Sequence, residues 1–165
     1  MTITVRSERV ADVAAIAEVV RAAFLDHPHS DGSEPAVVER LRDWGELMVS
    51  LVAAHDGQVI GHAAFSAITL TPPAPGWFGL GPLAVHPRWQ RQGIGAPLVW
   101  RGLEQLRAMA AAGGVVFGDP GYYGRFGFRS WPQLRYPAGP AALFQALTFG
   151  AAVPDATVAY SKTFG

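Results

Sequence analysis

The chain has no cysteine and a single lysine, Lys162, among its 165 residues. Without cysteine the protein has no disulfide, no thiolate nucleophile and no zinc–thiolate site. The lysine is distant from every glycine-rich segment, and the pattern G-x-x-x-x-G-K-[ST] is absent. A nucleotide triphosphatase loop is therefore excluded.

An excess charge of one sign and a long apolar run are also missing. The 13 Lys and Arg balance the 13 Asp and Glu, so no overall field attracts nucleic acid or an anionic membrane surface. The start of the chain lacks the basic and apolar regions of a signal peptide, and no apolar run approaches ~18 residues. Half of the residues are hydrophobic. We expect one domain over residues 1–165, in the cytoplasm, as a monomer or homodimer, with no nucleic-acid or membrane partner.

The spacing of apolar residues predicts alternating strands and helices. An Asp56-Gly57 pair between two β-rich runs is a strong hairpin signal. We predict strands at 2–6, 47–54, 59–70, 115–117, 143–149 and 157–164, helices at 11–24 and 35–44, and a longer helix from Ile94 to about Ala112 that stops at Gly113-Gly114. With one β–loop–α–β crossover, these elements indicate an α/β fold with a mixed sheet.

The stretch from Gly79 to Leu98 has the most specific organisation. Apolar Leu80, Leu83 and Val85 form a strand that stops before Pro87, and a loop, Q-R-Q-G-I-G, leads into the long helix. Such a loop presents backbone N–H groups at a helix N-terminus, so its natural ligand is a diphosphate, to which Arg91 and Arg88 add charge. Two glycines alone also fit a plain strand-to-helix turn, and the full dinucleotide-binding fingerprint is absent.

This loop resembles the pyrophosphate loop of the GNAT superfamily of acyl-CoA-dependent N-acetyltransferases, [QR]-x-x-G-x-[GA] after a strand that ends V-x-P. Gln90, Gly93 and Gly95 fill that pattern, and Val85-His86-Pro87 precedes it. GNAT enzymes also carry Y-x-x-x-G-F on a short helix after the next strand, and here Tyr123 is followed by Gly127-Phe128. On its own, this second segment is typical of a turn and an aromatic-rich strand. The two patterns in order identify the resemblance.

The wider motif, G-D-P-x-Y-Y-x-R-F-G-F, resembles a bacterial subgroup of GNAT proteins known mainly as predicted acetyltransferases, so the resemblance does not name a substrate. The chain has Asp119 where the superfamily often has Asn, which would reverse the hydrogen-bond polarity of any contact to the pantetheine arm. Pro97 enters the first helical turn without an N–H. The amides of about Arg91 to Ala96 would therefore form the phosphate cradle.

The resemblance implies a mixed, mostly antiparallel sheet flanked by helices, whose splayed central strands form the acyl-CoA cleft. It also implies transfer of an acetyl group from acetyl-CoA to a primary amine of a small molecule or protein, by direct attack and without a metal. Tyr123 would be the catalytic acid that protonates the departing thiolate. The cofactor-binding residues would be Leu83, Ala84, Val85, Gln90, Arg91, Gln92, Gly93, Ile94, Gly95 and Ala96.

Several points stay open at the level of sequence. The general base is His86, His62, Glu46 or a water chain, with Asp119 as a further candidate, and each histidine also fits a buried structural role. His27 and His29 fit a metal site or a solvated loop, and the latter is expected because no second ligand cluster completes a site. Asp26, Asp31 and Glu34 in that loop favour a cationic acceptor. The alternatives to an enzyme are a non-catalytic acyl-CoA sensor or scaffold and a plain structural domain.

Overall fold

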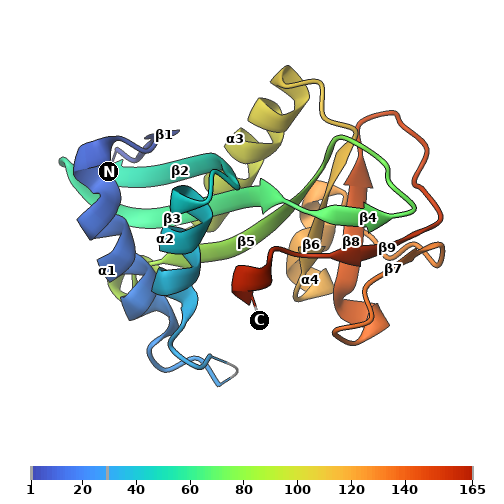
Figure 1. The fold of residues 1–165 in the computed structure, drawn as a ribbon. Coiled ribbons are helices and arrows are strands. Elements are labelled where there is room, and N and C mark those ends of the chain that lie inside the picture. Colours follow the sequence, from blue (N-terminus) through green and yellow to red (C-terminus); the bar gives the residue numbers. More distant parts are fainter. Residues whose placement is uncertain (1, 29, 165) are drawn as a thin grey trace.

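The computed structural model describes residues 2–28 and 30–164, which form two β-sheets and four α-helices. The main sheet has the order β1-β2-β3-β5-β6-β8 and the second sheet has the order β4-β9-β7 (Figure 1). The strands are β1 (Thr4–Ser7), β2 (Leu47–His55), β3 (Gln58–Ala67), β4 (Thr69–Thr71), β5 (Trp77–Val85), β6 (Gly113–Phe117), β7 (Leu134–Arg135), β8 (Phe144–Thr148) and β9 (Ala156–Ala159). The helices are α1 (Val13–Phe24), α2 (Glu34–Asp43), α3 (Gly95–Ala108) and α4 (Pro120–Tyr123).

The main sheet is mixed and mostly antiparallel, as predicted. Its only parallel pair in the described residues is β5 with β6, which α3 connects as a crossover. The predicted edge strand is confirmed as β1, and the Asp56-Gly57 turn joins β2 to β3. The second sheet was not predicted.

Helices cover both faces of the main sheet. Leu98, Leu103 and Leu106 of α3 pack against Leu51 and Phe65 on one face. On the opposite face, Ile16 and Val20 of α1 and Val38 of α2 pack against Val52 and Ala84. Each of these fully buried Leu, Ile, Val and Phe side chains contributes about 1.5–3 kcal/mol to stability. These layers hold β5, which carries the candidate site, in the middle of the core.

The run 59–70 is not one strand, which corrects the sequence prediction. β3 ends at Ala67, whose N–H donates to the Glu46 carbonyl just before β2 begins. Beyond this point no residue of β2 remains as a partner, so the chain crosses at Ile68 and pairs as β4 with β9. β9 is likewise shorter than predicted, because a 3-10 turn at Lys162–Phe164 follows it. Arg40 of α2 holds that turn with a 2.7 Å bond from Nε to Thr163 Oγ1.

The long helix also ends earlier than Gly113-Gly114. Ala110 takes a φ of +59°, and the Ala111 N–H bonds back to the Leu106 carbonyl at 3.0 Å, which caps α3 at its C-terminus. Gly113 and Gly114 instead begin β6. A Cβ on Gly113 would overlap the Leu147 carbonyl and the Trp77 ring, so this glycine serves close packing rather than helix termination.

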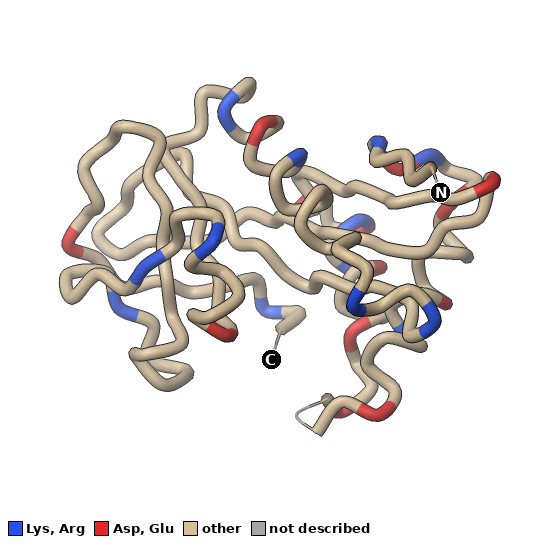
Figure 2. Tube along the Cα trace, turned by 180° about the vertical axis from the view of Figure 1, so that it is seen from behind, with Lys and Arg blue, Asp and Glu red and all other residues tan. Residues whose placement is uncertain are grey.

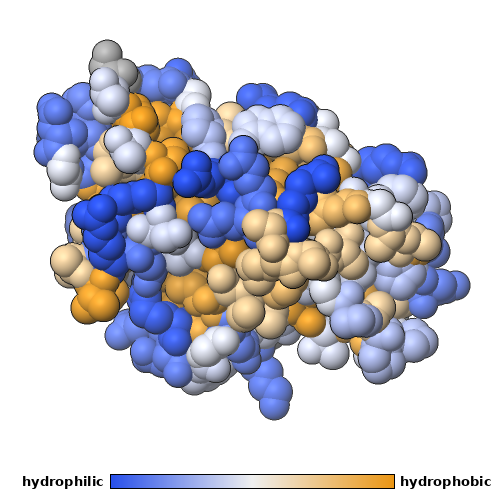
Figure 3. All heavy atoms as spheres, turned by 90° about the horizontal axis from the view of Figure 1, so that it is seen from above, coloured by the Kyte–Doolittle hydropathy of each residue, from blue (hydrophilic) through white to orange (hydrophobic). Residues whose placement is uncertain are grey.

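Charged residues of both signs are spread along the chain across the whole molecule (Figure 2). The face seen from above also mixes hydrophilic and hydrophobic residues (Figure 3). No helix within 2–28 and 30–164 is long and apolar enough to cross a membrane.

Candidate active site

The two central strands of the main sheet separate halfway along β5. β5 pairs with β6 only from Trp77 to Leu80, although it continues to Val85 beside β3. The His86 N–H donates to the Ile60 carbonyl of β3 at 2.8 Å. Because backbone groups alternate along a strand, the N–H groups of Leu83 and Val85 face away from β3, into the gap. The predicted splay of the central strands is thus confirmed.

A β-bulge lies where the strands begin to separate. Ala63 pairs with Leu83 and Phe65 with Leu80, so Ala64 alone faces Gly81 and Pro82. Gly81 has a φ of +148°, a conformation that favours glycine. The bulge bends β5 away from its neighbour, as expected from the Gly-Pro pair.

The loop after β5 has the glycine-dependent shape that the sequence indicates. A 3-10 turn at Pro87–Trp89 is followed by positive φ angles of 63° at Arg91 and 75° at Gly93, and α3 starts at Gly95. Arg91, Gln92 and Gly93 are exposed, whereas the Ile94 side chain is buried in the core and anchors the loop. The exposed backbone of this loop therefore precedes the positive end of the α3 dipole.

Gln90 has a role that its motif position alone did not indicate. Its side-chain Nε2 donates to the Val85 carbonyl at 2.9 Å, so it ties the loop to the open edge of β5. This bond occupies the Val85 carbonyl and leaves its N–H and the backbone groups of Leu83 facing the gap. Gln92 bonds similarly within the loop, from Nε2 to the Arg88 carbonyl at 3.3 Å.

The aromatic segment after β6 is helical rather than extended, as the resemblance implied. Asp119 caps α4 by accepting a 2.9 Å bond from the Gly121 N–H, and a 3-10 turn at Gly124–Phe126 ends at Gly127 with a φ of +99°. The Asp119 carboxylate is exposed and serves as a helix cap.

The two neighbouring tyrosines of α4 point to different places. The ring of Tyr123 packs over Gly118 and contacts Phe126 and Phe128, and its burial raises the pKa of the phenol to about 12. The Tyr122 hydroxyl instead lies 2.6 Å from where a Cβ on Gly95 would stand. Tyr123 is thus set into the aromatic core, whereas Tyr122 reaches the start of α3, a position that sequence spacing gave no means to predict.

The candidate bases occupy contrasting environments. His86 accepts a 3.2 Å bond from the Arg88 N–H at Nδ1, which makes it the cap of the loop's 3-10 turn. His62 is completely buried beneath α1 and α2. Glu46 lies at the junction of α2 and β2, and one of its carboxylate oxygens is buried with no hydrogen-bond partner among the described residues. His62 shares this feature, because its Nδ1 is also buried without a hydrogen-bond partner in the described part of the chain, whereas Nδ1 of His86 accepts the bond from Arg88.

His62 is the buried end of a polar network that the sequence did not indicate. Its Nε2 is 2.8 Å from Ser50 Oγ, and the Ser50 hydroxyl donates to Glu8, which Arg42 binds with two bonds of 2.8 and 2.9 Å. Burial lowers the pKa of His62 to about 4. These residues come from four separate segments, so only the tertiary structure brings them together.

The loop between α1 and α2 carries the predicted acidic residues. Asp31 accepts a 2.9 Å bond from the Ser33 N–H, and Glu34 accepts a 2.6 Å bond from Ser30 Oγ. Asp31 and Glu34 line a hollow of about 330 Å³ with Arg21 and Phe24, whereas Asp26 is not part of its lining. His29 of the suggested metal pair lies outside the described residues, and within 2–28 and 30–164 no three His, Asp or Glu gather to hold a metal.

Two solved structures resemble this chain over nearly its whole length. The GNAT family acetyltransferase from Brucella melitensis, solved in complex with acetyl-CoA, has a TM-score of 0.89 and 43% identity and covers 99% of each chain. YhbS from Escherichia coli, solved in complex with CoA, has a TM-score of 0.87 and 32% identity and covers 98% of this chain and 91% of that one.

Sequence comparison agrees with the structures. The chain is 40% identical over 107 residues to the uncharacterized N-acetyltransferase YhbS of Escherichia coli K12. These residues make up 64% of each protein, so the match spans less than two thirds of that relative. It is 33% identical over 114 residues to the mycothiol acetyltransferase of Thermobifida fusca, or 69% of this chain and 32% of that protein. The model of the acetyltransferase (GNAT) family matches residues 14–128, which include the loop and both tyrosines, and the chain therefore belongs to this family.

Proposed function

We propose that the protein transfers an acetyl group from acetyl-CoA to a primary amine. The observation that carries the proposal is the unpaired edge of β5 from Leu83 to Val85, which leads directly into a glycine loop at the N-terminus of α3. Two solved structures that match this chain over nearly its whole length were solved with acetyl-CoA or CoA.

Each part of the site suits one part of acetyl-CoA. The loop amides from Arg91 to Ala96 and the α3 dipole would hold the diphosphate. The N–H and C=O groups of Leu83 and the N–H of Val85 would pair with the pantetheine arm like an added strand. Ala84 is buried on the α1 face, so its side chain would not contact acetyl-CoA. Its part in the site would be to hold Leu83 and Val85 in their positions along the strand.

The chemistry is direct attack on the thioester. The amine nitrogen bonds to the carbonyl carbon while a backbone N–H of β5 stabilises the developing oxyanion, and the C–S bond then breaks to release the CoA thiolate. The nitrogen loses a proton, which passes to a base or to water. For an amine with a pKa near 10.4, deprotonation at pH 7 costs about 4.6 kcal/mol, so a base assists the reaction.

The buried environment of Tyr123 refines its proposed role. With a pKa of about 12, its phenol is fully protonated at neutral pH. Complete proton transfer from this phenol to a thiolate of pKa near 8.5 would be uphill by about 5 kcal/mol. Tyr123 would therefore stabilise the departing sulfur chiefly as a hydrogen-bond donor, with the proton supplied afterwards by water.

Glu46 is the candidate base that the environment favours, because His86 caps the loop turn and the His62 side chain is completely buried. The acidic residues Asp31 and Glu34 favour a cationic acceptor. The cytoplasmic location and the monomeric or homodimeric state stay predictions from the sequence.

The test combines binding with turnover. The melting temperature should rise with acetyl-CoA, with a stabilisation of about 2.7 kcal/mol at 100 times the dissociation constant. A panel of primary amines, including polyamines, aminoglycosides, amino acids and peptides with a free N-terminus, is then assayed for thiol release. Binding without release from any amine would favour a non-catalytic acyl-CoA-binding domain, and no binding would contradict the proposal.

A further inference from the structure

The Tyr122 hydroxyl is aimed at the first residue of α3. The hydroxyl oxygen lies 2.6 Å, and the ring carbon that carries it 3.8 Å, from the position of a Cβ on Gly95. The oxygen is thus the nearer of the two atoms, so the C–O bond is directed toward Gly95. The Leu83 side chain comes within 3.9 Å of the same position. The hydroxyl therefore lies where the α3 N-terminus meets the open edge of β5.

The surroundings of this hydroxyl are rich in hydrogen-bond donors. The first amides of a helix have no intrahelical acceptor, and those of α3 point toward the loop. In the described part of the chain the Tyr122 hydroxyl has no hydrogen-bond partner. A phenol beside the free amides of a helix N-terminus suits a ligand with several acceptor oxygens, and a phosphate provides them.

Arg125 fixes the Tyr122 ring from its other side. The guanidinium lies 4.4 Å from the centroid of the ring, and its Nε donates to the Tyr122 carbonyl at 3.0 Å. This cation–π contact holds the ring in place and keeps a positive charge beside it. No carboxylate within residues 2–28 and 30–164 forms an ion pair with Arg125, so its charge is not neutralised locally.

From this arrangement, and resting on the proposed function, we propose that Tyr122 binds the diphosphate of acetyl-CoA through its hydroxyl while Arg125 positions the ring. The pair would form a second wall of the phosphate site, opposite the loop amides. Tyr122 would then favour acyl carriers that have a phosphate over acyl thioesters that lack one. This role is distinct from that of Tyr123, whose ring packs over Gly118 and contacts Phe126 and Phe128.

The same geometry favours glycine at position 95, although the motif also accepts alanine. An alanine Cβ would come within 2.6 Å of the Tyr122 hydroxyl and push the ring aside. Removing the hydroxyl would make room for that Cβ. Gly95 and Tyr122 should therefore be energetically coupled.

The experiment compares two ligands by isothermal titration calorimetry: acetyl-CoA and S-acetylpantetheine, which has the same thioester arm without phosphates. A charge-assisted hydrogen bond implies that Tyr122→Phe raises the Kd for acetyl-CoA about 10- to 100-fold and leaves that for S-acetylpantetheine unchanged. Tyr136→Phe is the matched control, because Tyr136 packs against Phe117 and Phe144, and it should alter neither Kd.

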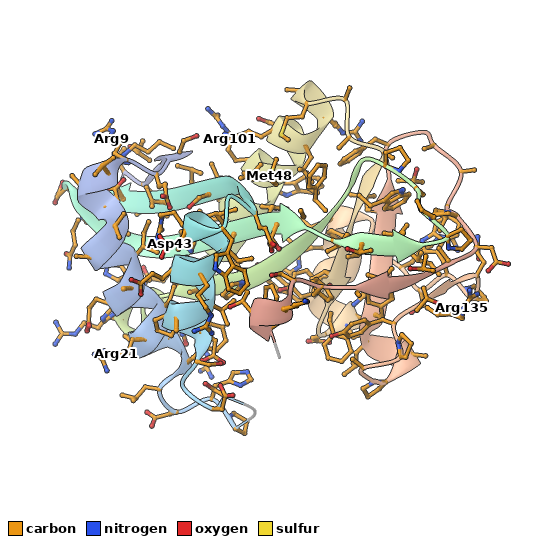
Figure 4. The ribbon with its side chains drawn as sticks, in the orientation of Figure 1. Arg9, Arg21, Asp43, Met48, Arg101 and Arg135 are labelled. Atoms are coloured by element: carbon orange, nitrogen blue, oxygen red, sulfur yellow. The ribbon has the colours of Figure 1, made fainter. Side chains whose placement is uncertain are left out.

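Two further variants test the parts of the arrangement separately. Arg125→Met should weaken acetyl-CoA binding at low salt, and the loss should shrink at high salt. Arg101→Met should have no effect, because Arg101 extends outward from α3 (Figure 4). Gly95→Ala should weaken acetyl-CoA binding in the native background but add no loss to Tyr122→Phe.

The outcomes separate this inference from the proposed function. Failure of the native protein to bind acetyl-CoA would contradict the proposed function itself. If the native protein binds and Tyr122→Phe weakens both ligands equally, Tyr122 contacts the pantetheine arm and the inference is wrong. Unchanged binding of both ligands by a folded Tyr122→Phe protein would also overturn it.

Discussion

His62 should make the folded protein sensitive to mild acid. In the folded state burial keeps its pKa near 4, whereas in the unfolded chain it returns to about 6.5. As the pH falls below 6.5, His62 binds a proton in the unfolded state but stays neutral in the folded state. The free energy of unfolding contributed by His62 is thus complete above pH 6.5 and is lost progressively as the pH falls toward 4.

The size of this loss follows from the two pKa values. A difference of about 2.5 units corresponds to about 3 kcal/mol in total, of which about 2 kcal/mol is lost between pH 7 and pH 5. That upper window is informative because the network carboxylate Glu8 has a lowered pKa. Burial alone would raise it, but the bonds from Arg42 and Ser50 outweigh this effect, so Glu8 takes up its proton at a lower pH.

Urea unfolding at pH 7, 6 and 5 measures the effect in the native protein and in His62→Gln. The variant lacks the titrating group. Between pH 7 and pH 5 its free energy of unfolding should therefore fall by about 2 kcal/mol less than that of the native protein, whatever the stability of the variant at pH 7. His86→Gln is the matched control, because its ring lies at the surface end of β5. Parallel pH profiles for the native protein and His62→Gln would refute the argument, because they would mean that His62 binds its proton equally well in the folded and the unfolded state.

The other predictions concern turnover, the loop, the core and the acceptor. Tyr123→Phe should lower kcat about 100-fold with little change in acetyl-CoA affinity or melting temperature, and near-normal turnover when chemistry limits the rate would reject the assignment. Gly93→Val should cost about 1–2 kcal/mol in urea unfolding through its positive φ and abolish acetyl-CoA binding in calorimetry, although no protein atom lies within 4 Å of the new Cβ. Gly102→Ala should lower the unfolding free energy by about 1–3 kcal/mol, because its Cβ would overlap the Phe65 ring, and an unchanged denaturation midpoint would contradict this packing. Asp31→Lys should raise KM for the amine and leave KM for acetyl-CoA unchanged, and equal changes in both would remove this loop from the acceptor site.

Sequence alone determined the features that depend on local chemistry. A glycine loop between an apolar strand and an amphipathic helix has few possible structures, and it indicated the candidate site at residues 83–96. The Asp56-Gly57 turn and the Y-x-x-x-G-F helix are likewise local, because each is set by backbone preferences within a few residues. The fold class and the family followed from these signals in order along the chain.

Only the tertiary structure decided what distant segments do to one another. The Gly113-Gly114 pair has the composition of a helix end, yet packing against Trp77 and Leu147 placed it in a strand. The run 59–70 has the pattern of one strand, but the limited length of β2 divided it between two sheets. Neighbouring Tyr122 and Tyr123 are chemically identical in the sequence. Their environments differ because Tyr122 contacts Gly95 whereas Tyr123 packs in an aromatic core. Contacts of this kind between distant segments leave no pattern in the local sequence.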